Sequence, residues 1–449
     1  METLIRDMGF LDVFLGTLYI LVAYFWAFNV VSKNNTFLYK RYYLRGISYK
    51  IGGALFFAGI YVFYYKGGDS IAFFGTIKAV YNLFYLEPSL TFDFLTDPFE
   101  NYPSAARYEA GSYGVQYLTR GIPSLTIIRI GFFLDLLCFN SYWALCVLFA
   151  VISYQFTWRF FVLLCDIYPR LHKEFALAVL FIPSALFWGS GLAKDTVMFG
   201  SVLFFVYCTY KALILRKRVL YYITLLLITA LLISFIRAFV LFTLIPCSLL
   251  MLTVHYRTSI QNSVARFVIG PALIVMGLAA SYFIVIGIGS STEAYNLESL
   301  EQKATGYRTW HTTQGGATYS LGGDPDDVSM GNLIRQAPLA ITYSLFGPFL
   351  WQVSNPVMLL SAVESMFLLY LMLRLLLTSK LWRIYETVIS EPLVAFALPF
   401  VIIMAIAIGL TSFNFGALVR YRIPILPFFL IMLVIINYRI GFNVASKKG

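Results

Sequence analysis

The segment Phe415–Pro427, FGALVRYRIPILP, follows one long apolar run, Pro392–Leu410, and leads into another, Ile423–Tyr438. Each run has close to the ~20 residues that a helix needs to cross the ~30 Å hydrocarbon core of a bilayer. Arg420 and Arg422 stand between the runs, at the level where charged side chains reach the polar headgroup region. The segment therefore predicts two membrane-spanning helices with a pair of guanidinium groups at the boundary between them.

The arginine pair has the features of an anion-binding site. Pro424 suits the first turn of the following helix, because the first helical amides have no partner within the helix. Free amides, the positive end of the helix dipole and two guanidinium groups would then converge, which favours a phosphate or pyrophosphate ligand. The alternative is that both arginines extend to the lipid headgroups and bind no ligand.

Apolar runs of similar length recur along all 449 residues, of which 60% are hydrophobic and 12% charged. The mean hydropathy of +0.77 excludes a soluble globular protein. We therefore expect an all-α polytopic integral membrane protein, a single transmembrane domain over residues 1–449 with about 11 spans. Besides the two runs above, the predicted spans are Phe10–Val31, Ile51–Tyr65, Ser141–Leu164, Phe175–Leu192, Thr196–Leu213, Val219–Ile236, Phe239–Val254, Phe267–Ile288 and Asn355–Leu377.

Basic residues predict an outer N-terminus and a cytoplasmic C-terminus. Lysine and arginine cluster in the inter-span segments 33–50 and 216–218, and such residues are enriched in cytoplasmic loops. Two long loops, residues 66–124 and 289–354, then fall on the outer side, where we expect short surface helices such as Ile71–Leu86. The net charge is +11, but the basic residues lie between the apolar spans and form no continuous patch. No nucleic-acid partner is therefore expected.

A second group of candidate residues follows two glycines in the sequence WGSGLAKD. Gly189 and Gly191 permit a tight turn. Lys194 is costly at membrane depth unless it meets an anion or a carboxylate, whereas Asp195 is well placed to cap the next helix. Arg237 stands at an outer corner between two predicted spans. We expect four cations to line one outward-facing diphosphate site: Lys194, Arg237, Arg420 and Arg422.

Three carboxylates are candidates for chemistry or for pairing with these cations. Asp69, in GGDS just beyond the second predicted span, is suited to act as a general base or to accept a sugar hydroxyl. Capping of the following helix is an equally good interpretation of Asp69, and Asp195 is the second candidate base. Glu364 lies inside an apolar run, so it should face the protein interior and pair with a cation.

The second long loop offers secondary candidates. Arg308 and His311 lie in GYRTWH, and Asp324 and Asp326 form a D-x-D pattern that we interpret as a solvated acidic turn. Neither an H-E-x-x-H zinc motif nor a P-loop occurs, and the five cysteines lack metal-ligand spacing. We therefore expect no metal and no cofactor.

The sequences FWGSGLAKD and NFGALVRYRIP resemble those of bacterial multi-spanning envelope-glycan proteins, the repeat-unit polymerases of the Wzy type and related GT-C-like glycosyltransferases. GDS after an early span and SLFGPFLWQVSN, residues 344–355, resemble further parts of that pattern. The arginine and glutamate expected near Gly347 and Gln352 are absent, so charge binding is not expected of this last segment.

The resemblance implies a multi-pass protein of the bacterial cytoplasmic (inner) membrane, with lipid-linked glycan donors, glycan acceptors and envelope glycan assembly proteins as partners. The implied activity is glycosyl transfer from a polyprenyl-diphosphate-linked donor at the outer face, with polymerisation of surface polysaccharide or O-antigen repeat units. The cations would stabilise the departing diphosphate and Asp69 or Asp195 would act on the acceptor hydroxyl. The alternatives are a transferase using polyprenyl-monophosphate sugars, a transporter or flippase of lipid-linked oligosaccharides, and a non-catalytic assembly factor.

Overall fold

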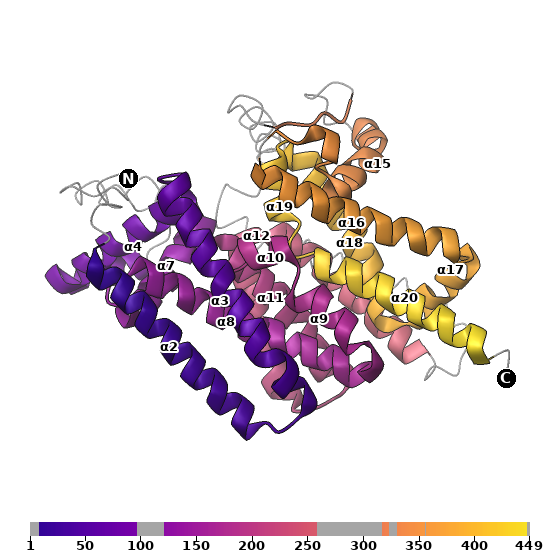
Figure 1. The fold of residues 1–449 in the computed structure, drawn as a ribbon, viewed down its shortest axis with the longest axis horizontal. Helices are drawn as coiled ribbons and strands as arrows, with labels where there is room; N and C mark the ends of the chain where they lie inside the picture. Colours follow the sequence, from indigo (N-terminus) through magenta and orange to yellow (C-terminus); the bar gives the residue numbers. More distant parts are fainter. Residues whose placement is uncertain (1–8, 97–120, 258–316, 323–329, 355, 447–449) are drawn as a thin grey trace. The chain divides into compact units, whose positions relative to one another are not determined.

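A computed structural model describes residues 9–96, 121–257, 317–322, 330–354 and 356–446, and its regular elements are all helices (Figure 1). An all-α polytopic membrane protein is therefore confirmed. The chain divides into two compact units, each described by itself. Unit 1 comprises residues 1–169, 179–207 and 228–237, and unit 2 comprises residues 170–178, 208–227 and 238–449.

Unit 1 is built on three long helices. α2, α3 and α8 pack side by side (Figure 1), and α3 continues through a π-helical turn, Ile60–Tyr64. α4 packs against α7, and α10 packs against α3. The helices that begin in this unit are α2 (Phe10–Lys33), α3 (Leu44–Gly59), α4 (Asp69–Leu86), α5 (Pro88–Thr96), α7 (Ile122–Cys138), α8 (Tyr142–Ile167), α10 (Pro183–Trp188) and α11 (Lys194–Thr209).

Unit 2 is organised around its most apolar helix, α18. α15 packs along α18 so closely that a Cβ on Gly409 would lie 2.4 Å from the carbonyl oxygen of Ala340. Ser344 Oγ donates a hydrogen bond to the carbonyl of Ala405 at 2.7 Å across the same contact. The helices of this unit are α15 (Met330–Phe346), α16 (Pro356–Thr378), α17 (Leu381–Ser390), α18 (Pro392–Ser412), α19 (Phe415–Tyr421) and α20 (Leu426–Ser446), whereas α9 (His172–Leu180) and α12 (Val219–Tyr256) contribute to both units.

The expected count of about 11 spans is not confirmed. Among the described residues, seven helices are long and apolar enough to cross a membrane, or eight if α19 and α20, bent by 62°, form one broken span. The sequence 219–256 forms one 38-residue element, broken only at Arg237 (φ −152°, ψ 85°), where two spans were predicted. The predicted span Phe175–Leu192 is instead divided between α9 and α10 before Pro183. The predicted span Phe267–Ile288 lies outside the described residues.

The described parts of the two predicted outer loops contain more packed structure than expected. α4 includes the predicted surface helix Ile71–Leu86, but its first half is buried at Phe73, Phe74 and Ile77. α15, in the second loop, is held against α18 as described above. Both helices bury apolar side chains against a neighbouring helix and therefore contribute to packing rather than lying free on a surface.

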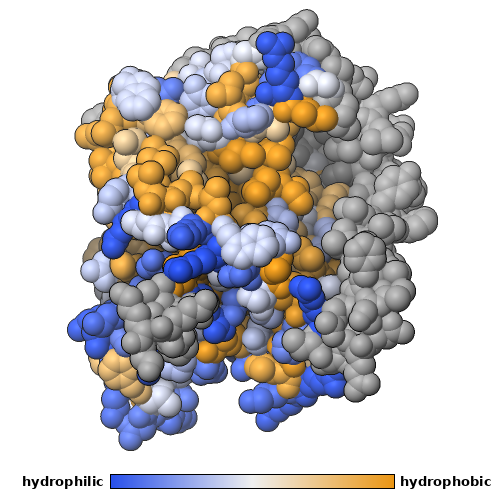
Figure 2. Space-filling model, turned by 90° about the vertical axis from the view of Figure 1, so that its right-hand side faces the viewer, coloured by the Kyte–Doolittle hydropathy of each residue, from blue (hydrophilic) through white to orange (hydrophobic). Residues whose placement is uncertain are grey.

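Exposed apolar side chains cover much of the described chain, as expected of a surface in contact with lipid. Figure 2 shows hydrophobic residues gathered over a broad area of the face that it draws. On α16, for example, Leu360 is 69% exposed and Phe367 is 55% exposed. A soluble protein rarely exposes so many large apolar groups together, so this pattern supports a multi-pass membrane protein.

The orientation predicted from the sequence, with an outer N-terminus and a cytoplasmic C-terminus, can be tested by cysteine labelling. Single cysteines in place of Lys66 and Asn34, both exposed and beyond opposite ends of the helical segment 37–64, should react with a membrane-impermeant thiol reagent from opposite sides. We expect Lys66→Cys to be labelled from outside intact cells and Asn34→Cys only after permeabilisation. The five native cysteines are buried, so background labelling should be low. The reverse pattern would mean that the predicted orientation is inverted.

Candidate functional site

The first candidate site is built where α11 begins. Gly189 follows α10, and the chain then turns through Gly191 before Lys194 opens α11. A Cβ on Gly191 would lie 2.0 Å from the ring of Phe57, so no larger residue fits against α3 here. The glycines of WGSGLAKD therefore permit the close approach that fixes where Lys194 and Asp195 emerge.

Asp195 and Arg237 form a buried ion pair. Arg237 Nη2 lies 2.6 Å from Asp195 Oδ1, and their side chains are 14% and 0% exposed. Asp195 also stands in the first turn of α11, where the helix dipole favours a negative charge. Removing one member of such a pair takes away the counter-charge of a buried group, which is strongly destabilising. Asp195 therefore holds Arg237 at the break in α12, which disfavours Asp195 as a freely accessible base.

Lys194 lies beside the first turns of two other helices. Its Nζ donates to Ser124 Oγ at 3.3 Å, on α7, and lies 5.5 Å from the ring centre of Phe73, on α4. Asp69 opens α4 one turn before Phe73 and is partly exposed. The side chain of Ser124 was not a candidate from the sequence, because no local signal relates it to Lys194.

A hydrogen bond fixes the start of α4 against α8. Ser70 Oγ and Tyr142 Oη are 2.9 Å apart, and both side chains are buried. Tyr142 is the first residue of α8, so the N-terminal ends of α4, α7, α8 and α11 gather at one end of unit 1. Four helix dipoles directed in this way add positive potential near Lys194 and Arg237. This positive potential suits binding of an anion beside Lys194, at the N-terminal ends of these helices.

In unit 2, Arg422 is fully buried, and both terminal nitrogens of its guanidinium group have partners within the protein. Its Nη1 donates to the carbonyls of Gly347 at 2.6 Å and Leu345 at 3.4 Å, at the end of α15. Its Nη2 donates to Ser365 Oγ at 2.9 Å and lies 3.6 Å from Glu364 Oε1. The expected pairing of Glu364 with an arginine is thus confirmed. Arg422 is not extended to lipid headgroups but joins α15, α16 and the α19–α20 break.

The local geometry around the arginine pair differs from the predicted helix start. α19 ends at Tyr421 and α20 begins at Leu426, so Arg420 lies in the last turn of α19 and Arg422 is its C-cap. The carbonyl end of a helix favours cations, which gives these arginines a structural reason to occur without an anionic ligand. Arg420 is partly exposed, whereas Arg422 is 0% exposed.

An aromatic cluster that the sequence did not indicate holds the start of α19. Tyr319 pairs with Phe413 through a backbone hydrogen bond of 3.1 Å, and its hydroxyl donates to the carbonyl of Gly409 at 2.9 Å. Its ring stacks on Tyr343 at 4.7 Å and lies 5.1 Å from Phe415. This segment of the second predicted loop is therefore part of the packing around α18 and α19.

The candidate residues fall into two groups. Asp69, Lys194, Asp195 and Arg237 belong to unit 1, whereas Glu364, Arg420 and Arg422 belong to unit 2, so their convergence on one ligand stays a prediction. Arg308, His311, Asp324 and Asp326 lie outside the described residues. Within the described ranges, no three His, Cys, Asp or Glu side chains lie close enough together to hold a metal ion.

Asp135, on α7, leads to a pH-dependence prediction. Its carboxylate is 0% exposed and accepts no hydrogen bond from the part of the chain that the structure describes. Burial raises its pKa from 3.8 to about 7, and the charge of Asp12 adds to this rise whereas that of Lys78 opposes it. The folded chain therefore holds the proton more tightly than the unfolded chain. This contribution to stability is full below pH 3.8 and is lost as pH rises through about 7.

Asp135→Asn, which resembles the protonated acid, should therefore remove this loss. We expect the wild type to lose about 1.4 kcal/mol of stability per pH unit between pH 5 and pH 7 relative to the variant. Thermal unfolding of both proteins at pH 5, 6, 7 and 8 measures it. Parallel curves for the two proteins would contradict a shifted pKa at Asp135.

Comparison with known proteins gives no relative: no family model, curated protein or solved structure matches this chain.

Proposed function

We propose that this protein transfers a glycosyl group from a polyprenyl-diphosphate-linked donor to a glycan acceptor at the outer face of the cytoplasmic membrane, polymerising surface polysaccharide or O-antigen repeat units. The observation that carries the proposal is Lys194 at the start of α11, next to the buried Asp195–Arg237 pair and among the N-terminal ends of four helices. A diphosphate at headgroup level, with its tail in lipid, fits a cationic site at the end of membrane helices.

The chemistry needs a group to take the acceptor proton and cations to stabilise the leaving group. An acceptor hydroxyl attacks the anomeric carbon, the bond from that carbon to the diphosphate oxygen breaks, and the hydroxyl proton passes to a base. Asp69 is the better base, because Asp195 is fully buried in its pair with Arg237. Lys194 would stabilise the departing diphosphate, which is the larger catalytic contribution in such reactions.

One observation favours a second function, transport of a lipid-linked oligosaccharide across the membrane. Transporters place broken helices within the membrane, and here one predicted span is broken between α9 and α10, while α19 and α20 form a pair bent by 62°. A transporter would move the donor without changing its glycan. The two functions therefore differ in their products and in the side of the membrane on which the donor accumulates.

Profiling of lipid-linked glycans in a strain that lacks the gene distinguishes these functions. A polymerase deletion should accumulate single repeat units that reach the outer face. A unit lacking one sugar would indicate a single-sugar transferase, such as one using polyprenyl-monophosphate donors. Complete units retained on the cytoplasmic side would indicate a transporter, and an unchanged profile would contradict all three.

A further inference from the structure

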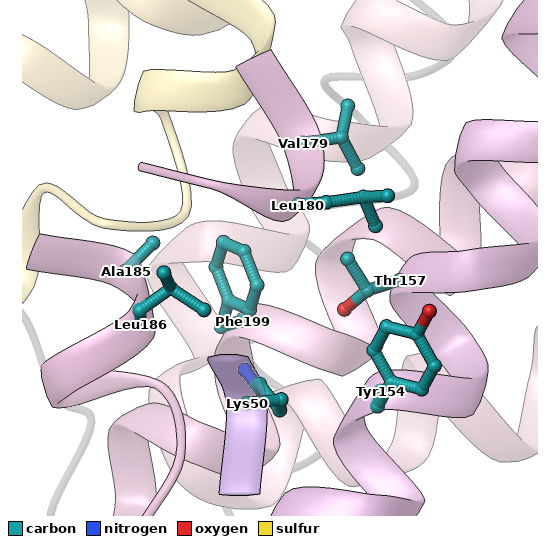
Figure 3. A pocket seen from close by; sticks show the side chains of 8 residues that line it. All are labelled: Lys50, Tyr154, Thr157, Val179, Leu180, Ala185, Leu186 and Phe199. Carbon is teal, nitrogen blue, oxygen red and sulfur yellow. The ribbon is translucent and has the colours of Figure 1, made fainter. Parts of the chain in front are cut away.

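A small cavity lies inside unit 1, beside a buried lysine (Figure 3). The cavity has a volume of about 10 Å³, room for one small ligand, and is lined from α3, α8, α9, α10 and α11. Its walls are mostly apolar. The lining residues are Lys50, Tyr154, Thr157, Val179, Leu180, Ala185, Leu186 and Phe199.

Lys50 lies within the candidate membrane span Tyr39–Tyr64 and is only 3% exposed. The sequence placed it in a cytoplasmic basic segment, but the helical segment begins well before it. Its Nζ donates to the carbonyl of Gly189 at 2.5 Å and lies 4.8 Å from the ring centre of Phe199. Among the described residues, no carboxylate forms an ion pair with Lys50. A buried ammonium without a counter-ion is costly, and one carbonyl and one ring offset only part of that cost.

Of the polar groups that line the cavity, the Lys50 ammonium is the one that can donate a hydrogen bond to a ligand there. Tyr154 Oη donates its proton to the carbonyl of Tyr43 at 2.8 Å, and Thr157 Oγ1 donates to the carbonyl of Ser153 at 2.9 Å. An ammonium has three N–H groups, of which Gly189 accepts one and the ring of Phe199 faces another. A third donor remains for a ligand in the adjoining space.

We propose that this cavity binds a small monovalent anion of the size of chloride, with Lys50 as its counter-ion. The space that a ligand can occupy, about 10 Å³, admits one small group and is far too small for a sugar or a lipid headgroup. The bound anion offsets the cost of burying the ammonium and so favours the protonated form of Lys50, which donates to Gly189. Because Gly189 begins the turn that leads to Lys194, the anion stabilises the turn on which the start of α11 depends.

Equilibrium binding of radiolabelled chloride to the purified full-length protein in detergent tests this inference. Gluconate replaces chloride at constant ionic strength, and thermal unfolding is followed in the same series. We expect saturable binding and a rise in Tm of the wild type that saturates over the same chloride range. Lys50→Met, which has a similar length and no charge, should bind chloride at least tenfold more weakly and show no dependence of Tm. Lys33→Met, at an exposed lysine of α2, is the matched control and should behave as the wild type.

Absence of saturable chloride binding by the wild type would overturn the proposal and indicate a neutral amine beside water. Unchanged binding by folded Lys50→Met would overturn it as well. If Lys50→Met does not fold, Ala185→Val is the second variant, because it narrows the cavity and keeps the lysine. Unchanged chloride binding by Ala185→Val would also overturn the proposal. Sulfate, which is larger and divalent, should not compete with chloride, and equal competition would contradict the assigned ligand size.

Discussion

Arg422→Met is expected to destabilise unit 2 by about 3–5 kcal/mol, the cost of breaking a buried ion pair by removing one partner. The substitution leaves Glu364 without this cation, and it removes the donors to the carbonyls of Leu345 and Gly347 and to Ser365 Oγ. Because all of these groups are buried, water does not readily replace the lost donors. Arg422→Lys should recover only part of the loss, since one ammonium cannot reach partners that the planar guanidinium joins at once.

Thermal unfolding of the purified variants measures this effect. Unfolding is monitored by the labelling of the buried cysteines with a thiol reagent as they become exposed. We expect Tm to fall on the order of 10 °C for Arg422→Met. Arg420→Met, on the same helix but partly exposed, is the matched control and should change Tm by much less. A similar small change at both positions would show that Arg422 does not hold α15, α16 and α20 together.

Lys194→Met is expected to reduce glycan assembly on the order of a hundredfold without unfolding the protein. Loss of a charge-assisted contact to a phosphate in a site with little water corresponds to ~2–3 kcal/mol in the barrier. Lys194 is partly exposed, so its replacement should cost less stability than the loss of a fully buried charge. Activity should therefore fall much further than stability.

Complementation of a deletion strain, at matched membrane expression, measures the effect. Lys66→Met removes a lysine that is exposed between α3 and α4 and is the matched control. Arg237→Met should lose stability as well as activity, because it removes the guanidinium group that pairs with the buried Asp195. Full glycan assembly by Lys194→Met would remove the start of α11 from the proposed diphosphate site.

The length and recurrence of the apolar runs predicted the fold class and the long helices, because an apolar run of about 20 residues crosses a membrane as a helix. α16 and α18 begin and end close to the expected residues. The same reasoning failed where a run is interrupted by proline or by a single charge. Pro183 divides one predicted span, and Arg237 breaks α12 without a loop of its own.

For the candidate site, the sequence indicated which charged residues matter but not which of them pair. Sequence reasoning identified Asp195, Arg237, Glu364 and Arg422 as functional candidates because a buried charge near a membrane needs a partner. In the structure these residues form two ion pairs, Asp195–Arg237 and Glu364–Arg422. The partner of a buried charge is set by helix packing, which residue spacing along one chain does not reveal.

Reconstitution of the purified protein in liposomes with a polyprenyl-diphosphate-linked oligosaccharide tests the proposed function most directly. The proposal predicts lipid-linked glycans of increasing length together with release of polyprenyl diphosphate, and it predicts loss of both products with Lys194→Met. A donor that keeps its original glycan length with no diphosphate released, or that only crosses the bilayer intact, would contradict glycosyl transfer by this protein.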